Sequence, residues 1–267
     1  MTKKNKENKK RDLTVLTPGD HFRFECHQRL DCFTRCCRNI TIFLTPYDIL
    51  RMKNALKITS GDFLTSYTDI LVGDAGLALV ALRMRDDEKK SCPFVTSGGC
   101  KIYEDRPWSC RIYPLKPEST DITEKSGKEY YSVMDIPFCL GLAEDKVMTV
   151  ERWKTMQGIP IYLEMENPFK KITMNKSLVD KKIINKKIQE MYYMACYDLD
   201  RFRRFVFESK FLETFEVDTE TVEKIKHDDF ELYKFAMRWL EYGLLGQHVL
   251  KMKPDVMEAQ KQEPKNK

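Results

Sequence analysis

Cysteine is spread unevenly along this chain, and its distribution constrains the fold more than any other feature of the sequence. Eight of the nine cysteines fall within the first 139 of 267 residues, and the ninth, Cys196, stands alone in a later segment. The eight are Cys26, Cys32, Cys36, Cys37, Cys92, Cys100, Cys110 and Cys139. Thiols gathered in this way predict that the N-terminal half folds around a metal centre, a redox centre or a set of disulfides.

Whether the protein is in a reducing or an oxidising compartment decides between bound metal or redox chemistry and disulfides. The first 12 residues are basic, like the start of a signal peptide, but a mixed polar segment follows where an apolar one would stand. The longest apolar stretch, 71–82, contains Asp74 and falls short of the ~18 apolar residues that a membrane helix needs. We therefore expect a cytoplasmic protein without a membrane span, whose thiols stay reduced and bind metal or carry out redox chemistry.

The net charge of +5 comes from the ends of the chain. Residues 1–12 hold six basic and two acidic side chains, and residues 251–267 hold five and three, which leaves 35 basic against 36 acidic between them. Such basic ends are usually solvated, so we predict disordered tails at 1–20 and 251–267 and no nucleic-acid partner. The overall hydrophobic content of 42% is enough for a buried core.

The cysteine-bearing half mixes helical and extended signals. Thr45 followed by Pro46 and Asp48 is typical of a helix start, and apolar spacing continues that helix to Leu56. A second helix is predicted to start at Ser60, and 77–82 reads as a buried strand after a turn. Short strands are also expected at 92–95 and 100–103, with the pair Gly98-Gly99 turning between them.

From Thr149 onward the pattern becomes helical. Thr149 is predicted to cap a helix over 151–157 that ends at Gly158, and longer amphipathic helices are predicted at 179–207 and 229–245. The phenylalanines between 202 and 215 recur at helical spacing, so we expect core packing rather than a ligand-stacking stripe. The sequence thus predicts a mostly helical α+β protein, with a cysteine-cluster domain at 21–145 and a helical domain at 146–250.

A soft or borderline ion explains the number of cysteines, because iron and zinc are held by thiolate sulfur, usually four thiolates to a closed site. The chain has no Cys-x2-Cys pair, and only Cys32 with Cys36 or Cys37 has zinc-knuckle spacing. The spacing also differs from ferredoxin patterns. An iron–sulfur cluster accepts ligands from widely spaced loops, so we favour it and keep zinc as the alternative. Buried free thiols remain a further alternative.

The cysteine pair, the ninth cysteine, a histidine and the neighbouring cations each bear on this metal-site hypothesis. The adjacent pair Cys36 and Cys37 either serves different sites, sits on irregular backbone or forms a vicinal disulfide. Cys196 lies in an apolar helical segment, where we expect it to be core, and His27 is a secondary ligand candidate. Cations flank the cysteines and would offset a negative thiolate site or pair with Glu25, Asp31, Glu104 and Asp105. They are Arg29, Arg35, Arg38, Lys101, Arg106 and Arg111.

The same residues resemble a known family. Three segments are similar to the YkgJ-type cysteine-cluster family. They are the Cys-x5-Cys-x3-Cys-Cys motif, the 45–50 helix, and the run from Cys92 through Cys100-Lys-Ile-Tyr-Glu-Asp-Arg-Pro-Trp-Ser-Cys110-Arg-Ile-Tyr-Pro114. That family is described as zinc- or iron-chelating and includes flagellin lysine methylases. The resemblance covers about 22–142 and implies metal binding. It extends only loosely to the helical remainder, which is similar in general pattern to longer bacterial members.

Two departures from the family pattern bear on individual residues. Leu140 replaces a proline in the element that includes Cys139, and the first cluster lacks the commoner Cys-x2-Cys-x2-Cys-Cys spacing. The second departure makes the assignment of Cys26 weaker than those of Cys32, Cys36 and Cys37.

Three functions remain open on this reading. The chain is a redox or cluster-dependent iron–sulfur protein, a zinc-stabilised module whose helical half binds a protein partner, or, from the resemblance, a metal-dependent protein-lysine methyltransferase. The sequence has no Gly-rich signature for a nucleotide-like methyl donor, and it has no Walker, His-Glu-x2-His or Gly-x-Ser-x-Gly motif. The sequence therefore identifies no catalytic residue and leaves enzyme activity open.

Overall fold

The computed structural model describes residues 15–73, 76–118, 128–175, 178, 185–256 and 258. Over these residues the protein is mostly helical with short strands, which confirms the predicted α+β class. The chain forms two compact units, each built from two segments. The first unit comprises Met1–Phe33 and Cys110–Ile159, and the second comprises Thr34–Ser109 and Pro160–Lys267. The domain limits drawn from the sequence stay predictions, and most of both predicted tails lies outside the described residues.

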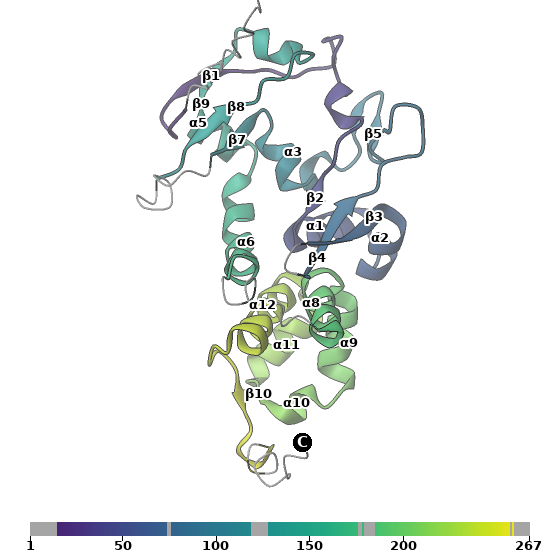
Figure 1. Ribbon diagram of the computed structural model, residues 1–267, viewed down its shortest axis with the longest axis vertical. Coiled ribbons are helices and arrows are strands. Elements are labelled where there is room, and N and C mark those ends of the chain that lie inside the picture. The colour runs from purple at the N-terminus through teal and green to yellow at the C-terminus, as the bar shows by residue number, and fades with distance from the viewer. Residues whose placement is uncertain are drawn as a thin grey trace, which may run out of the picture. The chain divides into compact units, whose positions relative to one another are not determined.

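The first unit is built from two antiparallel strand pairs and a short helix (Figure 1). Strand β1 (His21–Arg23) pairs with β9 (Val147–Thr149), and β7 (Leu115–Pro117) pairs with β8 (Tyr131–Val133). Helix α5 (Val150–Met156) follows β9 directly. The unit also contains the 3-10 turn η3 (Leu140–Ala143).

Trp153 forms the centre of the small core of the first unit. Its ring meets Phe22 and Phe24 edge-on, with centroids 6.1 and 5.4 Å apart. Its indole N–H donates to the carbonyl of Ile112 at 3.2 Å, so the polar edge of the ring is satisfied as well. The predicted helix start at Thr149 is confirmed, because the Thr149 hydroxyl accepts the backbone N–H of Arg152 at 3.1 Å. The core therefore holds the segment just before Cys26 and the segment just after Cys110 in place.

The second unit contains a three-stranded antiparallel sheet in the order β2-β4-β3. The strands are β2 (Phe43–Leu44), β4 (Ala78–Leu82) and β3 (Thr68–Val72). Strand β4 lies in the middle and is the strand predicted at 77–82. Helices α1 (Pro46–Leu56) and α2 (Ser60–Tyr67) connect β2 to β3, at the positions predicted from the sequence.

Helix α1 begins as its sequence predicts. The Thr45 hydroxyl accepts the backbone N–H of Asp48 at 3.2 Å, and Asp48 accepts the backbone N–H of Thr45 at 2.8 Å. This is a complete capping box, with Pro46 in the first turn. Asp48 is buried and also accepts the backbone N–H of Trp108 at 2.8 Å, so the cap fixes the start of the short helix α3 (Trp108–Ile112).

Helices complete the second unit, and α8 to α12 lie together in Figure 1. The predicted helix at 229–245 is confirmed as α12, whereas the described part of 179–207 forms two helices that meet at Asp198. Ring contacts such as Phe202–Trp239, with centroids 5.4 Å apart, confirm that the phenylalanines pack in a core. The helices are α6 (Ile159–Thr173), α8 (Lys186–Tyr197), α9 (Leu199–Glu208), α10 (Phe211–Thr214), α11 (Thr219–His227) and α12 (Asp229–Leu245).

The remaining elements are short. Strand β10 (Phe215–Glu216) pairs with β11 (Lys251–Met252), and β5 (Val95–Thr96) pairs with β6 (Gly99–Cys100). The hairpin β5-β6 turns at Ser97-Gly98, one residue earlier than predicted, because Gly99 already pairs with Thr96 as the first residue of β6. Its strands are shorter than the predicted 92–95 and 100–103. Residues after Cys100 instead enter the 3-10 turn η2 (Tyr103–Asp105). Within the described ranges, no helix combines the length and the apolar character needed to cross a membrane.

Candidate metal centre

The structure divides the eight clustered cysteines equally between the two units. Cys26, Cys32, Cys110 and Cys139 belong to the first unit, and Cys36, Cys37, Cys92 and Cys100 belong to the second. None of the eight forms a disulfide bond in the structure, so the vicinal disulfide considered from the sequence is absent here. Each unit thus holds as many thiols as one closed metal centre requires.

In the first unit, three cysteine-bearing segments lie against one another. The Cys32 sulfur accepts the backbone N–H of Leu140, the residue after Cys139, at 3.3 Å. The backbone N–H of Glu25, next to Cys26, donates to the carbonyl of Gly141 at 3.0 Å. The segments around Cys26 and Cys32 therefore share the η3 turn that follows Cys139.

Cys110 is placed by the hydrophobic core of the same unit. It lies on α3, and the next residue but one, Ile112, accepts the indole N–H of Trp153. Tyr113 continues the chain and meets the ring of Phe24 edge-on, with centroids 5.8 Å apart. Since Phe24 lies two residues before Cys26, the core brings the Cys110 and Cys26 segments together.

In the second unit, the adjacent pair lies on irregular backbone, as one of the sequence-based alternatives required. Cys36 and Cys37 form the 3-10 turn η1 (Arg35–Cys37), which follows Thr34 in a left-handed conformation with φ of 63°. The backbone N–H of Cys92 donates to the carbonyl of Cys37 at 2.8 Å. The β5-β6 hairpin then returns the chain, so that Cys100 pairs with Val95 close to Cys92.

The thiol pKa values differ within the second unit. A hydrogen bond with the Cys37 side chain lowers the pKa of Cys36 to about 7. Burial raises the pKa of Cys92 and of Cys100, because it disfavours the charged thiolate. A bound cation would reverse the effect of burial, since metal ligation stabilises the thiolate form.

Four buried polar atoms without a hydrogen-bond partner in the structure belong to residues that neighbour clustered cysteines in the sequence. They are His27 Nδ1, Arg38 Nε, Trp108 Nε1 and Ser109 Oγ. Each of the four residues is within two positions of a cysteine in the sequence. Buried polar groups are nearly always hydrogen-bonded in folded proteins, so several such atoms beside thiols suit a centre rich in acceptor sulfur. The residue types present fit a thiolate-bound metal or iron–sulfur centre, but no three of the eight cysteine sulfurs, all of which the structure describes, lie within 4.8 Å of one another.

Two of the six flanking cations are not surface ion-pair partners of the nearby acids. Arg106 and Arg111 are buried and donate to the carbonyls of Tyr103 and Gln157. Two of the acids considered as partners pair elsewhere. Glu25 accepts from Lys146 at 3.0 Å, and Asp105 forms an ion pair with Arg51 of α1 at 2.6 Å.

The ninth cysteine has a different environment. Cys196 on α8 is fully buried, and burial raises the pKa of its thiol well above the usual range. It lies beside Tyr192, also fully buried. The prediction that Cys196 belongs to the core is confirmed, and it serves as an internal control for the other eight.

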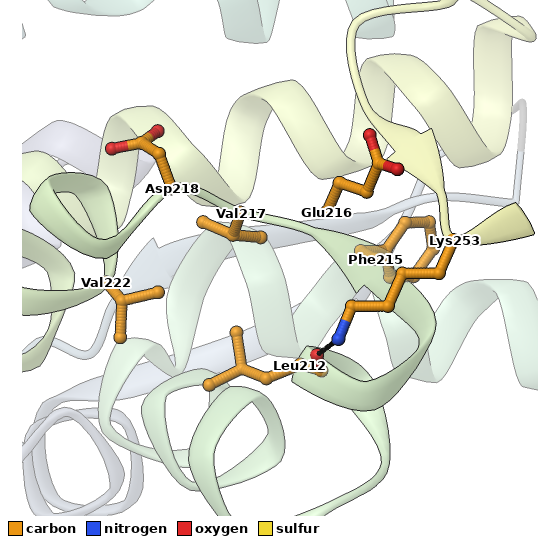
Figure 2. Close-up of a pocket in the computed structure, with 7 residues that line it drawn as sticks. All are labelled: Leu212, Phe215, Glu216, Val217, Asp218, Val222 and Lys253. Carbon is orange, nitrogen blue, oxygen red and sulfur yellow. Dashed lines mark hydrogen bonds between the residues drawn. The ribbon is translucent and has the colours of Figure 1, made fainter.

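One surface pocket of about 570 Å³ lies among the helices of the second unit (Figure 2). Lys253 extends along it and donates to the carbonyl of Leu212 at 2.8 Å. Its other lining residues contribute two carboxylates and apolar side chains, with no cysteine or histidine. They are Phe215, Glu216, Val217, Asp218 and Val222. This pocket therefore contains no thiol ligand and is not part of the candidate metal centre.

Comparison with known families assigns the cysteine-rich segment. Residues 25–135 match the family model CxxCxxCC, described as "Putative zinc- or iron-chelating domain". The match agrees with the cysteine-cluster family that this segment resembles. No curated protein and no solved structure was found to be similar to the chain.

The match covers every clustered cysteine except Cys139, which follows it in the chain. The match therefore supports metal binding, namely the chelation of zinc or iron by the cysteine-cluster segment. The helical region from α6 to α12 lies outside the match, and the comparison gives it no function.

Proposed function

We propose that the cysteine-cluster segment binds an iron–sulfur centre through its thiols and that the protein acts in redox or cluster-dependent chemistry. The proposed ligands are Cys26, Cys32, Cys36, Cys37, Cys92, Cys100, Cys110 and Cys139. Eight thiols are enough for one four-ligand centre with thiols in reserve, or for two centres. The observation that carries the proposal is the group of buried, unpartnered donors within two positions of these cysteines in the sequence.

Those donors favour a sulfur-rich centre. Trp108 Nε1 can only donate a hydrogen bond, and Arg38 Nε likewise carries a proton to give. Hydrogen bonds from such groups to ligand or inorganic sulfur stabilise a cluster and shift its reduction potential. A single zinc ion offers only the ligand sulfurs as acceptors, whereas a cluster adds inorganic sulfide. The irregular spacing of the cysteines also suits the larger centre.

The buried cations have a complementary effect. Four thiolates around a cluster core of charge about +2 leave a net negative centre. Arg106 and Arg111, both buried close in sequence to Cys100 or Cys110, would reduce the cost of that charge. When bound, such a cluster supplies one-electron transfer, and the chain's own residues set its potential and its access to solvent.

Anaerobic purification of the full-length protein tests the proposal. We expect a brown protein with broad absorbance near ~400 nm and with iron and acid-labile sulfide in stoichiometric amounts. A colourless protein that contains about one or two zinc ions and no sulfide would contradict it.

That contradicting result would select a zinc-stabilised interaction module, which the family description favours equally because it names zinc beside iron. In that case the metal would supply folding energy to the loop-rich segment. The helices α8 to α12 would then be the surface for a protein partner.

A further inference from the structure

We propose a second cation site, separate from the thiols, formed by Glu25, His27 and Glu144 of the first unit. One donor atom from each of these residues lies within 4.8 Å of the other two. Among the residues that the structure describes, this is the one such group of three His, Cys, Asp or Glu donors. The site would take a divalent first-row transition cation through one nitrogen and two carboxylate oxygens.

The backbone explains why Glu25 and His27 act together without Cys26. Phe24 extends the pairing of β1 with β9 by one residue, since its N–H donates to the carbonyl of Lys146 at 3.0 Å. On extended backbone, alternate side chains leave the chain on the same side. Consistent with this, the donor atoms of Glu25 and His27 lie within 4.8 Å of each other.

Glu144 is brought to this pair by the loop that begins at Gly141. The N–H of Glu25 donates to the carbonyl of Gly141 at 3.0 Å, so backbone bonds fasten the loop on both sides of Glu144. A Cβ at position 141 would lie 2.4 Å from the Glu25 carbonyl oxygen, which is closer than any real contact allows. The close approach of the two segments thus requires glycine at this position.

The distances suit a shared ion better than a direct hydrogen bond. His27 Nε2 and Glu144 Oε2 are 3.5 Å apart, which is long for a hydrogen bond but short enough for two ligands of one cation. A neutral imidazole and two carboxylates carry a charge of −2, which balances a divalent ion. The histidine and Glu144 side chains are 26% and 34% exposed, so the donors are partly desolvated yet open to solvent.

Lys146 is the main competitor for the site. Its ammonium group lies 3.0 Å from Glu25 Oε1, and it lowers the pKa of Glu25. A carboxylate has two oxygens, so Glu25 can keep this ion pair through one and offer the other to a cation. Asp145 also lies in this loop, but its side chain is fully exposed and pairs with Arg23 at 3.3 Å.

The nitrogen and oxygen donors of this site determine which cation is suitable for a binding experiment. Carboxylate and imidazole ligands suit Mn²⁺, Fe²⁺ and Zn²⁺, but Mn²⁺ is the weakest binder of the series and prefers oxygen to thiolate. Mn²⁺ therefore reports on this site without displacing a metal held by the cysteines. Electron paramagnetic resonance measures free Mn²⁺ directly during a titration of the full-length protein, purified anaerobically with its native metal retained.

We expect the wild-type protein to bind one Mn²⁺ per chain, and Glu144→Gln and His27→Ala each to weaken that binding at least about tenfold. Asp145→Asn is the matched control, because it removes the same charge from the same loop without removing a proposed donor. His21→Ala, on β1, controls for loss of an imidazole. Both controls should bind Mn²⁺ like the wild type.

Two results would overturn the site. One is a wild-type protein that binds no Mn²⁺ at submillimolar concentration, which would leave His27 and Glu144 as an ion pair only. The other is equal weakening by Asp145→Asn and Glu144→Gln, which would indicate diffuse charge attraction. Iron, sulfide and zinc are measured on the same samples and should be unchanged in Glu144→Gln. The iron, sulfide and zinc contents thus test the proposed function, and Mn²⁺ binding tests the second cation site independently.

Discussion

At the scale of single residues, Gly141 shows how one missing side chain positions the chemistry of the first unit. Its α-carbon lies so close to the Glu25 backbone that any Cβ would meet the carbonyl oxygen. The same residue follows Leu140, whose N–H donates to the Cys32 sulfur. One glycine thus sets the spacing between the Cys26 and Cys139 segments.

Gly141→Ala is therefore expected to destabilise the first unit by about 1–3 kcal/mol, because backbone atoms must shift to admit the methyl group. Thermal and denaturant unfolding measure this cost. Gly243→Ala on α12 is the control, since its Cβ would meet no atom within 4 Å and alanine favours a helix by roughly 0.5–1 kcal/mol. Equal effects of the two substitutions would show that the close approach at Gly141 is not maintained.

At the scale of elements, a buried ion pair fastens α1 to α12. Lys53 on α1 is 5% exposed, and its ammonium group lies 2.6 Å from Asp229 at the first turn of α12. Asp229 also pairs with Arg203 of α9. Buried charges are costly unless paired, so these helices depend on Asp229 more than on any surface ion pair.

Asp229→Ala should lower the free energy of unfolding by about 1–3 kcal/mol, because it removes the closer partner of a buried ammonium and leaves Asp200 at 3.6 Å. Denaturant unfolding followed by circular dichroism measures the loss. Glu231→Ala breaks the more exposed pair with Lys234 on the same helix and should cost less than about 1 kcal/mol. A similar small cost for both would contradict the assigned importance of the buried pair.

The elements also show which parts of the fold could be predicted from the sequence. Helices α1 and α12 were predictable because their ends are coded locally, by the Thr45 capping box and by Asp228 and Gly246. The break between α8 and α9 was not, because it depends on a distant residue. The Asp198 carboxylate caps α9 and also accepts the Ser60 hydroxyl of α2 at 2.6 Å.

The candidate sites divide in the same way. The clustered cysteines were evident from their number and the Cys100–Pro114 motif, and the family match supports their metal binding. Glu25 and Glu144 were not predicted as ligands, because acidic residues are common and these two are far apart in the sequence. Only the backbone bonds between the two segments bring them together.

At the scale of the whole molecule, metal and helices contribute differently to stability. The cysteine-bearing segments form short strands and 3-10 turns, whereas α8 to α12 enclose a core of aromatic rings. Short irregular segments bury too little apolar surface to be stable without additional constraints, and a bound metal supplies that constraint. We expect the helical region to remain folded without it.

Removal of the metal with a chelator under reducing conditions should therefore act locally. Hydrogen exchange is expected to accelerate over 24–37, 92–113 and 139–144, while α12 keeps its protection. Mass spectrometry of peptides from the loaded and stripped protein measures the difference. A loss of protection spread evenly over the chain, or none at all, would contradict a metal-dependent cysteine segment.

The central claim, that the clustered thiols and not the protein's cysteines in general hold the metal, is tested most directly by two matched substitutions. Metal content is measured by elemental analysis on anaerobically purified Cys110→Ser and Cys196→Ser proteins. The account predicts that Cys110→Ser loses metal and that Cys196→Ser, at its fully buried position, retains the wild-type amount. Equal metal loss from both variants, or none from Cys110→Ser, would contradict it.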